Sequence, residues 1–205
     1  MQRTWMTRIG IVTLALAIVA LSGSAHAEKK EKSAKTLEIG AEVPDFKLSD
    51  CCGKEHTLSS LKGKVVVLSF TSQTCPWSKG HDPDADALAK EYAGKDVVFI
   101  HIDSAKDNTA ESIHEYKEEN KLEIPVLKDV NNAFADQVGA KQTPEVFVVD
   151  KEGKLAYHGA YDNRKEPTAK GSENYVKAAV DALLDGKPVQ TAQVKAWGCG
   201  IKRAS

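Results

Sequence analysis

The sequence predicts an α/β domain in which helices flank a central mixed β-sheet. Two continuous apolar runs, at residues 65–68 and 97–102, have the composition of strands that are covered on both faces. A segment with helical spacing follows each run, and residues 146–159 then form the pattern of a strand, a tight turn and a second strand. Parallel strands joined by helices, with an antiparallel hairpin beside them, give a mixed sheet.

The first 27 residues have the pattern of a secretory signal peptide. Arg3 and Arg8 precede an apolar run at residues 9–21, which is too short to span a bilayer comfortably, and Ala25-His26-Ala27 forms a small-x-small cleavage site. We expect a periplasmic or secreted protein with no stable membrane insertion after cleavage; an uncleaved anchor is the alternative. Residues 28–37 begin with a run rich in Lys and Glu and are expected to be a solvated tether.

The mature chain is expected to form one domain at residues 38–187, followed by a C-terminal tail at residues 188–205. Its length allows a proper core, and the sequence has no internal repeat. Loss of Arg3 and Arg8 from the 28 basic residues leaves 26 against 29 acidic ones, a formal charge of −3. Such a mixed surface predicts no nucleic-acid partner.

Each strand and helix of the domain is predicted from its own sequence pattern. Phe70 extends the first strand, residues 71–74 form a polar turn, and the segment from Cys75 to Tyr92 has helical composition. Residues 97–102 form a strand, residues 109–120 a helix, and residues 124–127 lead to a short helix at 131–138 that Gly139 caps. The last helix, at residues 174–184, is amphipathic, with a predicted inward face of Tyr175, Ala179, Ala182 and Leu183.

Cys75 lies where the first strand ends and the first long helix begins. Unpaired N–H groups and the positive end of the helix dipole favour an anion at this position, so they lower the pKa of the thiol. Because the thiolate is the nucleophile, Cys75 is the predicted reactive residue. The alternative is a small buried hydrophobic residue, which is the usual role of a free cysteine.

The other three cysteines, Cys51, Cys52 and Cys199, fit neither a disulfide scaffold nor a Cys/His zinc pattern by their spacing. We therefore expect redox chemistry, with no metal and no cofactor. Cys51 and Cys52 precede Gly53 at a predicted hairpin turn, and adjacent cysteines rarely bond each other because the ring is strained. They are exposed turn thiols, a redox relay or a partner for Cys199.

Several stretches resemble known proteins. Residues 41–70, with Pro-Asp-Phe and the predicted hairpin, resemble the opening of the redoxin group that includes alkyl hydroperoxide reductases and thiol-specific antioxidants. Phe70 followed by Cys75-Pro76-Trp77-Ser78 resembles the strand-to-active-site passage of thioredoxin-like proteins. The stretches at residues 75–81 and 198–202 also resemble segments of certain bacterial redoxin-family proteins, so the resemblance covers residues 39–202. It implies a thioredoxin-like three-layer sandwich with a central mixed β-sheet.

The resemblance also implies the residues of the site. Cys75 is the nucleophile, and Thr143-Pro144 is a cis bond that exposes a backbone edge to a substrate chain. The substrate-contacting residues are expected to be Ser72, Pro76, Trp77, Ser78, Thr143 and Pro144. His81 is six residues after Cys75, on another side of an ideal helix, which indicates a surface or packing residue and not a catalytic base.

The chain departs from the thioredoxin pattern at three positions. Ser78 replaces the second cysteine, Ser69 the buried acid, and Thr74 the preceding tryptophan. Without a thiol at residue 78, another thiol must resolve a mixed disulfide on Cys75. Cys199 is the predicted partner, because a tail of about a dozen extended residues at roughly 3.3 Å each is long enough to reach it. A static bond from Cys199 to Cys51 or Cys52 is the competing pairing.

Three functions remain open. We favour a thiol-disulfide oxidoreductase that acts on protein or small-molecule thiols and disulfides. The alternative is a thiol peroxidase that reduces hydroperoxides through a Cys75 sulfenic acid. Ser72 matches a peroxiredoxin hydroxyl residue, but Leu68 replaces their proline and no activating arginine is evident, since only Arg164 precedes Arg203 in the mature chain. The third is a redox-inactive binding or scaffold module.

Overall fold

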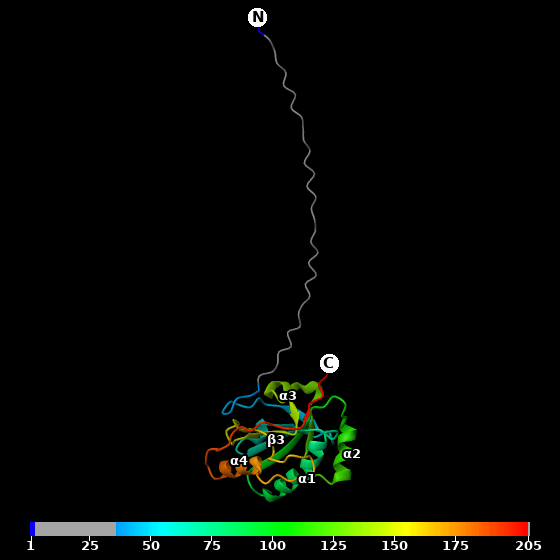
Figure 1. Cartoon of the computed structure of the whole chain (residues 1–205), viewed down its shortest axis with the longest axis vertical. Helices are drawn as coiled ribbons and strands as arrows, with labels where there is room; N and C mark the ends of the chain where they lie inside the picture. The colour runs from blue at the N-terminus through cyan, green and yellow to red at the C-terminus, as the bar shows by residue number, and fades with distance from the viewer. Residues whose placement is uncertain (3–35, 205) are drawn as a thin grey trace. The chain divides into compact units, whose positions relative to one another are not determined.

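The computed structural model describes residues 1–2 and 36–204 (Figure 1). The predicted signal peptide and nearly all of the predicted tether lie outside the described residues. Within the described part of the chain, no helix has the length and apolar character that a membrane span requires. Residues 36–204 belong to a single structural unit.

The centre of this unit is a seven-stranded mixed sheet with the order β2-β1-β5-β4-β3-β7-β8. β3 is parallel to β4, and β4 to β5, whereas β7 is antiparallel to β3. The remaining pairs, β1 with β2, β1 with β5, and β7 with β8, are antiparallel. The strand bounds are β1 Lys47–Asp50, β2 Glu55–Thr57, β3 Val65–Thr71, β4 Val97–Asp103, β5 Val126–Lys128, β7 Glu145–Val149 and β8 Leu155–Gly159.

Helices lie on both faces of the sheet, which confirms the predicted three-layer arrangement. In Figure 1, α3 lies on one side of β3, and α1 and α4 lie on the other. The helices are α1 Pro76–Glu91, α2 Ala110–Asn120, α3 Ala133–Val138 and α4 Tyr175–Leu184, with short 3-10 turns at η1 Ser59–Leu61 and η2 Val130–Asn132. Two further short strands, β6 Gln142–Thr143 and β9 Cys199–Gly200, pair separately.

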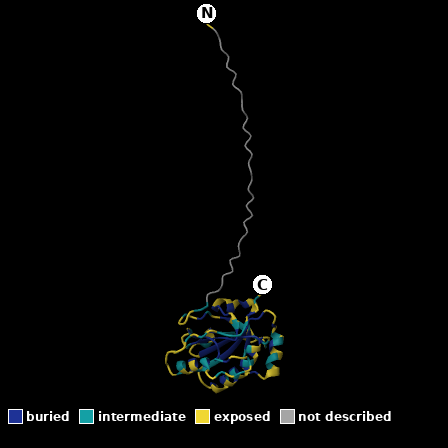
Figure 2. Ribbon diagram, in the orientation of Figure 1, coloured by how far each residue is buried: buried dark blue, intermediate teal, exposed yellow. Residues whose placement is uncertain are grey.

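Strand β3 divides the apolar interior into two cores, and all of its residues are buried (Figure 2). Val66, Leu68 and Phe70 face the core that contains α3, whereas Val65 and Val67 face the core of α1 and α4. This alternation is the ordinary period of a strand. Each such side chain contributes about 1.5–3 kcal/mol on burial, so both layers hold β3 and the loop at its end in place.

The helix boundaries agree with their sequence signals. Thr109 caps α2 in a reciprocal capping box with Ser112, and Gly139 ends α3 in the left-handed conformation. The predicted inward face of α4 is partly wrong: Val176, Ala179 and Val180 are buried there, while Tyr175 and Leu183 are only half-buried and Ala182 is outside the core. The helix is therefore rotated toward its β-branched residues, which fit the flat face of the sheet.

The C-terminal tail packs along β8 before it reaches β9. The His158 N–H donates to Ala192 O at 3.0 Å, and the Val194 N–H donates to His158 O at 3.1 Å. Gly159, at φ 144°, allows this approach, since a Cβ there would lie 1.7 Å from Val194 O. Residues beyond 188 thus form part of the domain surface near the carboxyl end of β3.

Candidate functional site

Cys75 occupies the position that the sequence predicts, at the N-cap of α1, and is buried. Its backbone N–H donates to Ser72 O at 2.9 Å, which closes the turn that follows β3. The Thr143-Pro144 peptide bond is cis, as predicted, and it lies beside this thiol. The Cys75 Sγ donates to Thr143 O at 3.0 Å.

The tail brings Cys199 to the same place. β9 pairs with β6 in antiparallel fashion, with Cys199 opposite Thr143 and Gly200 opposite Gln142. Both Cys75 and Cys199 are free thiols, and both meet Thr143: Cys75 donates to its carbonyl oxygen, and Cys199 is its register partner. The backbone edge that was expected to receive a substrate chain is therefore occupied by the protein's own C-terminal strand.

The environment separates the acidities of the two thiols. Burial opposes ionisation of Cys75, but hydrogen bonds from the Cys199 and Thr143 side chains and from the Ser78 and Cys199 backbone outweigh it and lower the pKa of Cys75. Burial, followed by the interaction with Cys75, raises the pKa of Cys199 to about 11. Of this pair, Cys75 is therefore the more readily ionised thiol, and Cys199 retains its proton to higher pH.

Close contacts on both sides of Cys199 fix the tail. The rings of Trp77 and Trp197 lie with their centroids 4.8 Å apart, and the Trp197 Nε1–H donates to Asp162 O at 3.0 Å. Gly198 has φ 134°, and a Cβ on it would lie 2.1 Å from Thr143 O. The Ile201 N–H donates to Lys141 O at 3.0 Å, and the Ile201 side chain joins the α3 core.

The two predicted serines hold the active-site turn together. Ser78 is fully buried, and its Oγ accepts a hydrogen bond from the Ser72 N–H at 3.2 Å. The Ser72 Oγ is 3.0 Å from the Thr74 Oγ1 and accepts from the Asn108 Nδ2 at 3.1 Å. Asn108 was not predicted from the sequence, because no local pattern distinguishes it from other loop residues. Pro76 is the first residue of α1, where a missing N–H is tolerated.

His81 is a packing residue, as one of the predicted alternatives held, and it is fully buried. Its ring stacks on His101 at 5.6 Å and meets the Tyr161 ring edge-on at 4.8 Å. The His81 Nδ1 is 3.2 Å from the Asp82 Oδ1. Burial lowers the pKa of His101 to about 4, which keeps that imidazole neutral at pH 7. His101 is the register partner of Ser69 on β3.

The two arginines of residues 36–204 are both held in ion pairs. The Arg164 guanidinium binds Asp162 and Asp84, at 2.7 and 2.8 Å, and donates to Gly80 O at 2.8 Å. Arg203 pairs with Asp136. The acidic partners of Arg164 further stabilise its charged form and raise its pKa, although burial opposes them. Neither guanidinium has the position of a free cation beside Cys75.

A second group of thiols lies at the turn between β1 and β2. The Cys51 and Cys52 sulfur atoms are 3.9 Å apart, and His114 Nδ1 of α2 is 3.9 Å from the first and 4.0 Å from the second. Burial, followed by the neighbouring Cys52, raises the pKa of Cys51. These residues contact one another, whereas Cys199 pairs with Thr143 beside Cys75. His114 was not singled out in the sequence.

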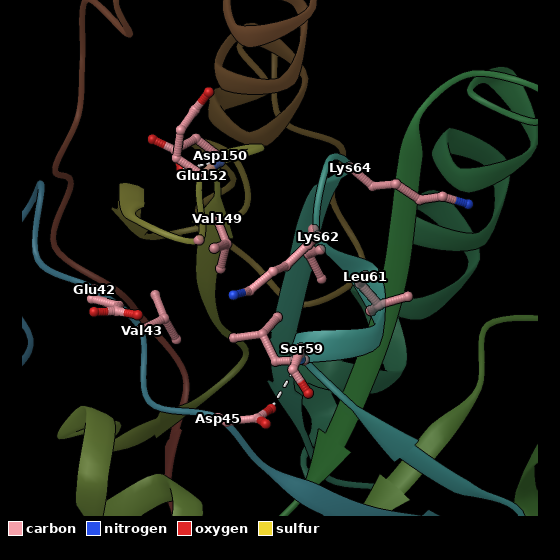
Figure 3. Close-up of a pocket in the computed structure, with 13 residues that line it drawn as sticks. Glu42, Val43, Asp45, Ser59, Leu61, Lys62, Lys64, Val149, Asp150 and Glu152 are labelled. Atoms are coloured by element: carbon pink, nitrogen blue, oxygen red, sulfur yellow. Dashed lines mark hydrogen bonds between the residues drawn. The ribbon is translucent and has the colours of Figure 1, made fainter.

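A cavity of about 200 Å³ lies at the other end of β3, beside Lys64, which precedes the strand, and Val66 near its start (Figure 3). Figure 3 shows Lys62 extending into it, with Glu42 and Val43 on one side and Leu61 on the other. The Ser59 N–H donates to the Asp45 Oδ1 at 2.9 Å and fixes one edge. The lining has no cysteine or histidine, so this cavity is separate from the thiol chemistry.

Comparison with known proteins gives the same picture of the fold. Residues 39–158 match the model of the AhpC/TSA family. The thiol-disulfide oxidoreductase ResA of Bacillus thuringiensis subsp. konkukian (strain 97-27) is 30% identical over 149 residues, which cover 73% of this chain and 80% of that protein.

Solved structures agree with this match. The crystal structure of a hypothetical protein from Sinorhizobium meliloti 1021 has a TM-score of 0.77 and 30% identity, covering 83% of this chain and 97% of that one. The thioredoxin domain of a thiol-disulfide oxidoreductase from Bacteroides vulgatus has a TM-score of 0.55 at 20% identity, covering 65% and 94% of the two chains. The fold is thioredoxin-like.

Proposed function

This chain belongs to the AhpC/TSA family, and we propose that it is an exported thiol-disulfide oxidoreductase in which Cys75 attacks and Cys199 resolves. The observation that supports the proposal is the meeting of both thiols at Thr143: Cys75 Sγ donates to Thr143 O at 3.0 Å, and Cys199 is the register partner of Thr143 in the β6–β9 pair. Its substrates are protein or small-molecule disulfides, and its site of action is the periplasm or the cell exterior, without stable membrane insertion.

In the first step, the Cys75 thiolate attacks one sulfur of a client disulfide. A bond forms between Cys75 Sγ and that sulfur, the client S–S bond breaks, and the other client sulfur leaves as a thiolate. The lowered pKa of Cys75 raises the fraction of the thiol that is present as thiolate, because hydrogen bonds to the sulfur outweigh the effect of burial.

In the second step, Cys199 attacks the Cys75 sulfur of the mixed disulfide. The Cys75–Cys199 bond forms, the remaining client sulfur leaves as a thiolate, and the client has gained two electrons. Because the charge on Cys75 contributes to the high pKa of Cys199, formation of the mixed disulfide removes that contribution. The proton of Cys199 passes to a departing client thiolate. An external dithiol then reduces the Cys75–Cys199 bond and restores both thiols.

The contacts of the tail imply a condition for client access. A client that pairs with the edge of Thr143 must displace β9, which already pairs there. Residues Trp77 and Trp197 lie over this junction and are the side chains that a client would meet first. We therefore propose that Pro76, Trp77 and Pro144 form the contact surface, while Ser72 and Ser78 fix the turn beneath it.

Hydroperoxide reduction is the second candidate, because the same thiolate can attack the terminal oxygen of a hydroperoxide: an S–O bond forms, the O–O bond breaks, and an alcohol or water leaves, giving a Cys75 sulfenic acid. Condensation with Cys199 would then form the disulfide and release water. The engaged state of Arg164 and Arg203 favours the disulfide reaction, since neither is left to stabilise a departing oxygen.

The test is insulin reduction by the mature protein with dithiothreitol, together with peptide mapping of the oxidised protein. We expect turnover and a Cys75–Cys199 disulfide. Rapid stoichiometric oxidation of Cys75 by micromolar peroxide, combined with no insulin reduction, would assign the peroxidase instead. An unreactive Cys75 in both assays would indicate a binding or scaffold module.

A further inference from the structure

The turn between β1 and β2 places two sulfur atoms and one imidazole nitrogen at nearly equal distances. The sulfurs of Cys51 and Cys52 are 3.9 Å apart, and His114 Nδ1 is 3.9 and 4.0 Å from them. These atoms come from two elements separated by more than 60 residues in sequence. The proposed exchange between Cys75 and Cys199 makes no use of them.

The size of this triangle fits a metal ion. The centre of a triangle with these edges lies about 2.3 Å from each corner, which is the length of a zinc–thiolate bond and close to that of a zinc–imidazole bond. A tetrahedral ion above the plane needs the edges to shorten by a few tenths of an ångström. Rotation of the exposed Cys52 and His114 side chains permits that change.

The surrounding structure holds the donors in place. Asp50 Oδ1 accepts from the Cys52 and Lys54 N–H groups at 2.9 and 3.0 Å, and Asp50 Oδ2 is 2.9 Å from His56 Nε2. On the other side, α2 is fixed by the buried Ile113, adjacent to His114, and by the cap at Thr109. Both halves of the cluster are therefore set by the fold before any ion binds.

We propose that Cys51, Cys52 and His114 form a site for a thiophilic d10 cation, zinc(II) or copper(I), that joins the β1–β2 turn to α2. Two thiolates and a neutral imidazole neutralise a divalent ion, and binding releases the two thiol protons. The exposed rim leaves one coordination position open to water or to an exogenous thiol. No linear sequence motif contains all three ligands, because His114 lies on α2, far along the chain from Cys51 and Cys52.

The other group of three possible ligands, His81, Asp82 and His101, is a weaker candidate. All three are buried, they lack sulfur, and the cavity beside Asp82 and His101 measures about 10 Å³. Such a space is about the size of a single water, and it has no open approach for a hydrated ion. The exposed thiol cluster has both the softer ligands and the access.

The experiment uses the untagged mature protein, fully reduced, and titrates it with zinc(II) against a chromophoric chelator. Cobalt(II) serves as a spectroscopic substitute that reports thiolate ligation, and copper(I) is titrated in parallel against a copper(I) chelator. We expect one ion per chain, and Cys52→Ser and His114→Gln should each weaken binding at least tenfold. Cys199→Ser is the matched control, since it also removes one thiol and should leave binding unchanged.

Insulin reduction provides a readout that separates this site from the proposed function. His114→Gln should retain the wild-type rate within about twofold, which also shows that the variant folds. Loss of binding in both Cys52→Ser and His114→Gln, with either zinc or copper(I), supports the site and identifies the ion. The proposal is overturned if neither ion binds at micromolar concentration, or if binding persists in these variants and is lost in Cys75→Ser or Cys199→Ser.

Discussion

The two thiol pairs of this protein contain the same functional group in opposite surroundings. Cys75 lies at the N-terminus of α1 and Cys199 on strand β9, and hydrogen bonds lower the pKa of Cys75 against the effect of burial. Cys51 and Cys52 lie in an exposed turn, where burial and the second thiol raise the pKa of Cys51. The comparison teaches that hydrogen bonds to the sulfur, more than exposure, decide which of the two thiols has the lowered pKa.

The two pairs also differ in how the thiols of each pair relate to one another. At the first site one thiol is acidified while its partner has a pKa raised to about 11, so the two are suited to consecutive steps. At the second, both sulfurs face a common centre with His114. One arrangement favours transfer of electrons between sulfurs, and the other favours holding an ion between them.

The largest expected effect comes from removing the nucleophile. Cys75→Ser should lower the rate of insulin reduction by on the order of a hundredfold or more, because no other thiol has the same backbone contacts. Cys51→Ser is the matched control and should retain the rate within about twofold. The comparison breaks if Cys51→Ser is the inactive variant and Cys75→Ser is not.

The next effect comes from the resolving thiol. Cys199→Ser should lower multiple-turnover rates by roughly tenfold or more while the first attack on the client continues, since only the second step needs a thiol there. A mixed disulfide between Cys75 and insulin should then accumulate and be visible by intact mass spectrometry. Cys52→Ser should show no such adduct; equal accumulation in both variants would remove the distinction between the two pairs.

A smaller effect is expected from alanine substitution of the two glycines that flank Cys199, and the two substitutions should differ. Gly198→Ala places a Cβ 2.1 Å from Thr143 O at φ 134°, so it should push β9 away and destabilise the fold by about 1–3 kcal/mol. Gly200→Ala meets no atom within 4 Å and should be near neutral. Urea unfolding and the rate of Cys75–Cys199 disulfide formation measure both effects. Equal behaviour of the two variants would mean that β9 does not hold Cys199 at Cys75.

The smallest effect is a shift in pH dependence. The alkylation rate of Cys75 by iodoacetamide should fall as the pH drops through its lowered pKa, because the thiolate is lost. Among the groups that lower this pKa the Cys199 side chain is the largest, so Cys199→Ala should move the midpoint to higher pH. Cys51 in the same samples should titrate above the ordinary cysteine range. A Cys199→Ala midpoint at or below the wild-type value would contradict the proposed hydrogen bond.

Part of this site follows from sequence patterns that act over short distances. The apolar run of β3 and the Pro at the start of α1 are signals within a few residues, and the structure confirms both. The cis Thr143-Pro144 bond was predicted from the family resemblance, and the structure confirms it as well. The thioredoxin-like order of strands and helices was predicted for the same reason. The buried face of α4 was predicted only in part. The helical period indicates which residues share a face, but it does not indicate which strands that face packs against.

The sequence by itself determined that Cys75 would stand at a strand-to-helix junction, because local periodicity and helix capping are decided by adjacent residues. The family resemblance placed Thr143-Pro144 beside it and left two pairings open for Cys199, and only the tertiary structure decided between them. Thr143 lies 68 residues from Cys75, and Cys199 reaches both through a two-residue strand pair. His114 is likewise 63 residues from Cys51. Such contacts depend on how the sheet, the helices and the C-terminal tail pack against one another. The spacing of residues along the chain does not determine that packing.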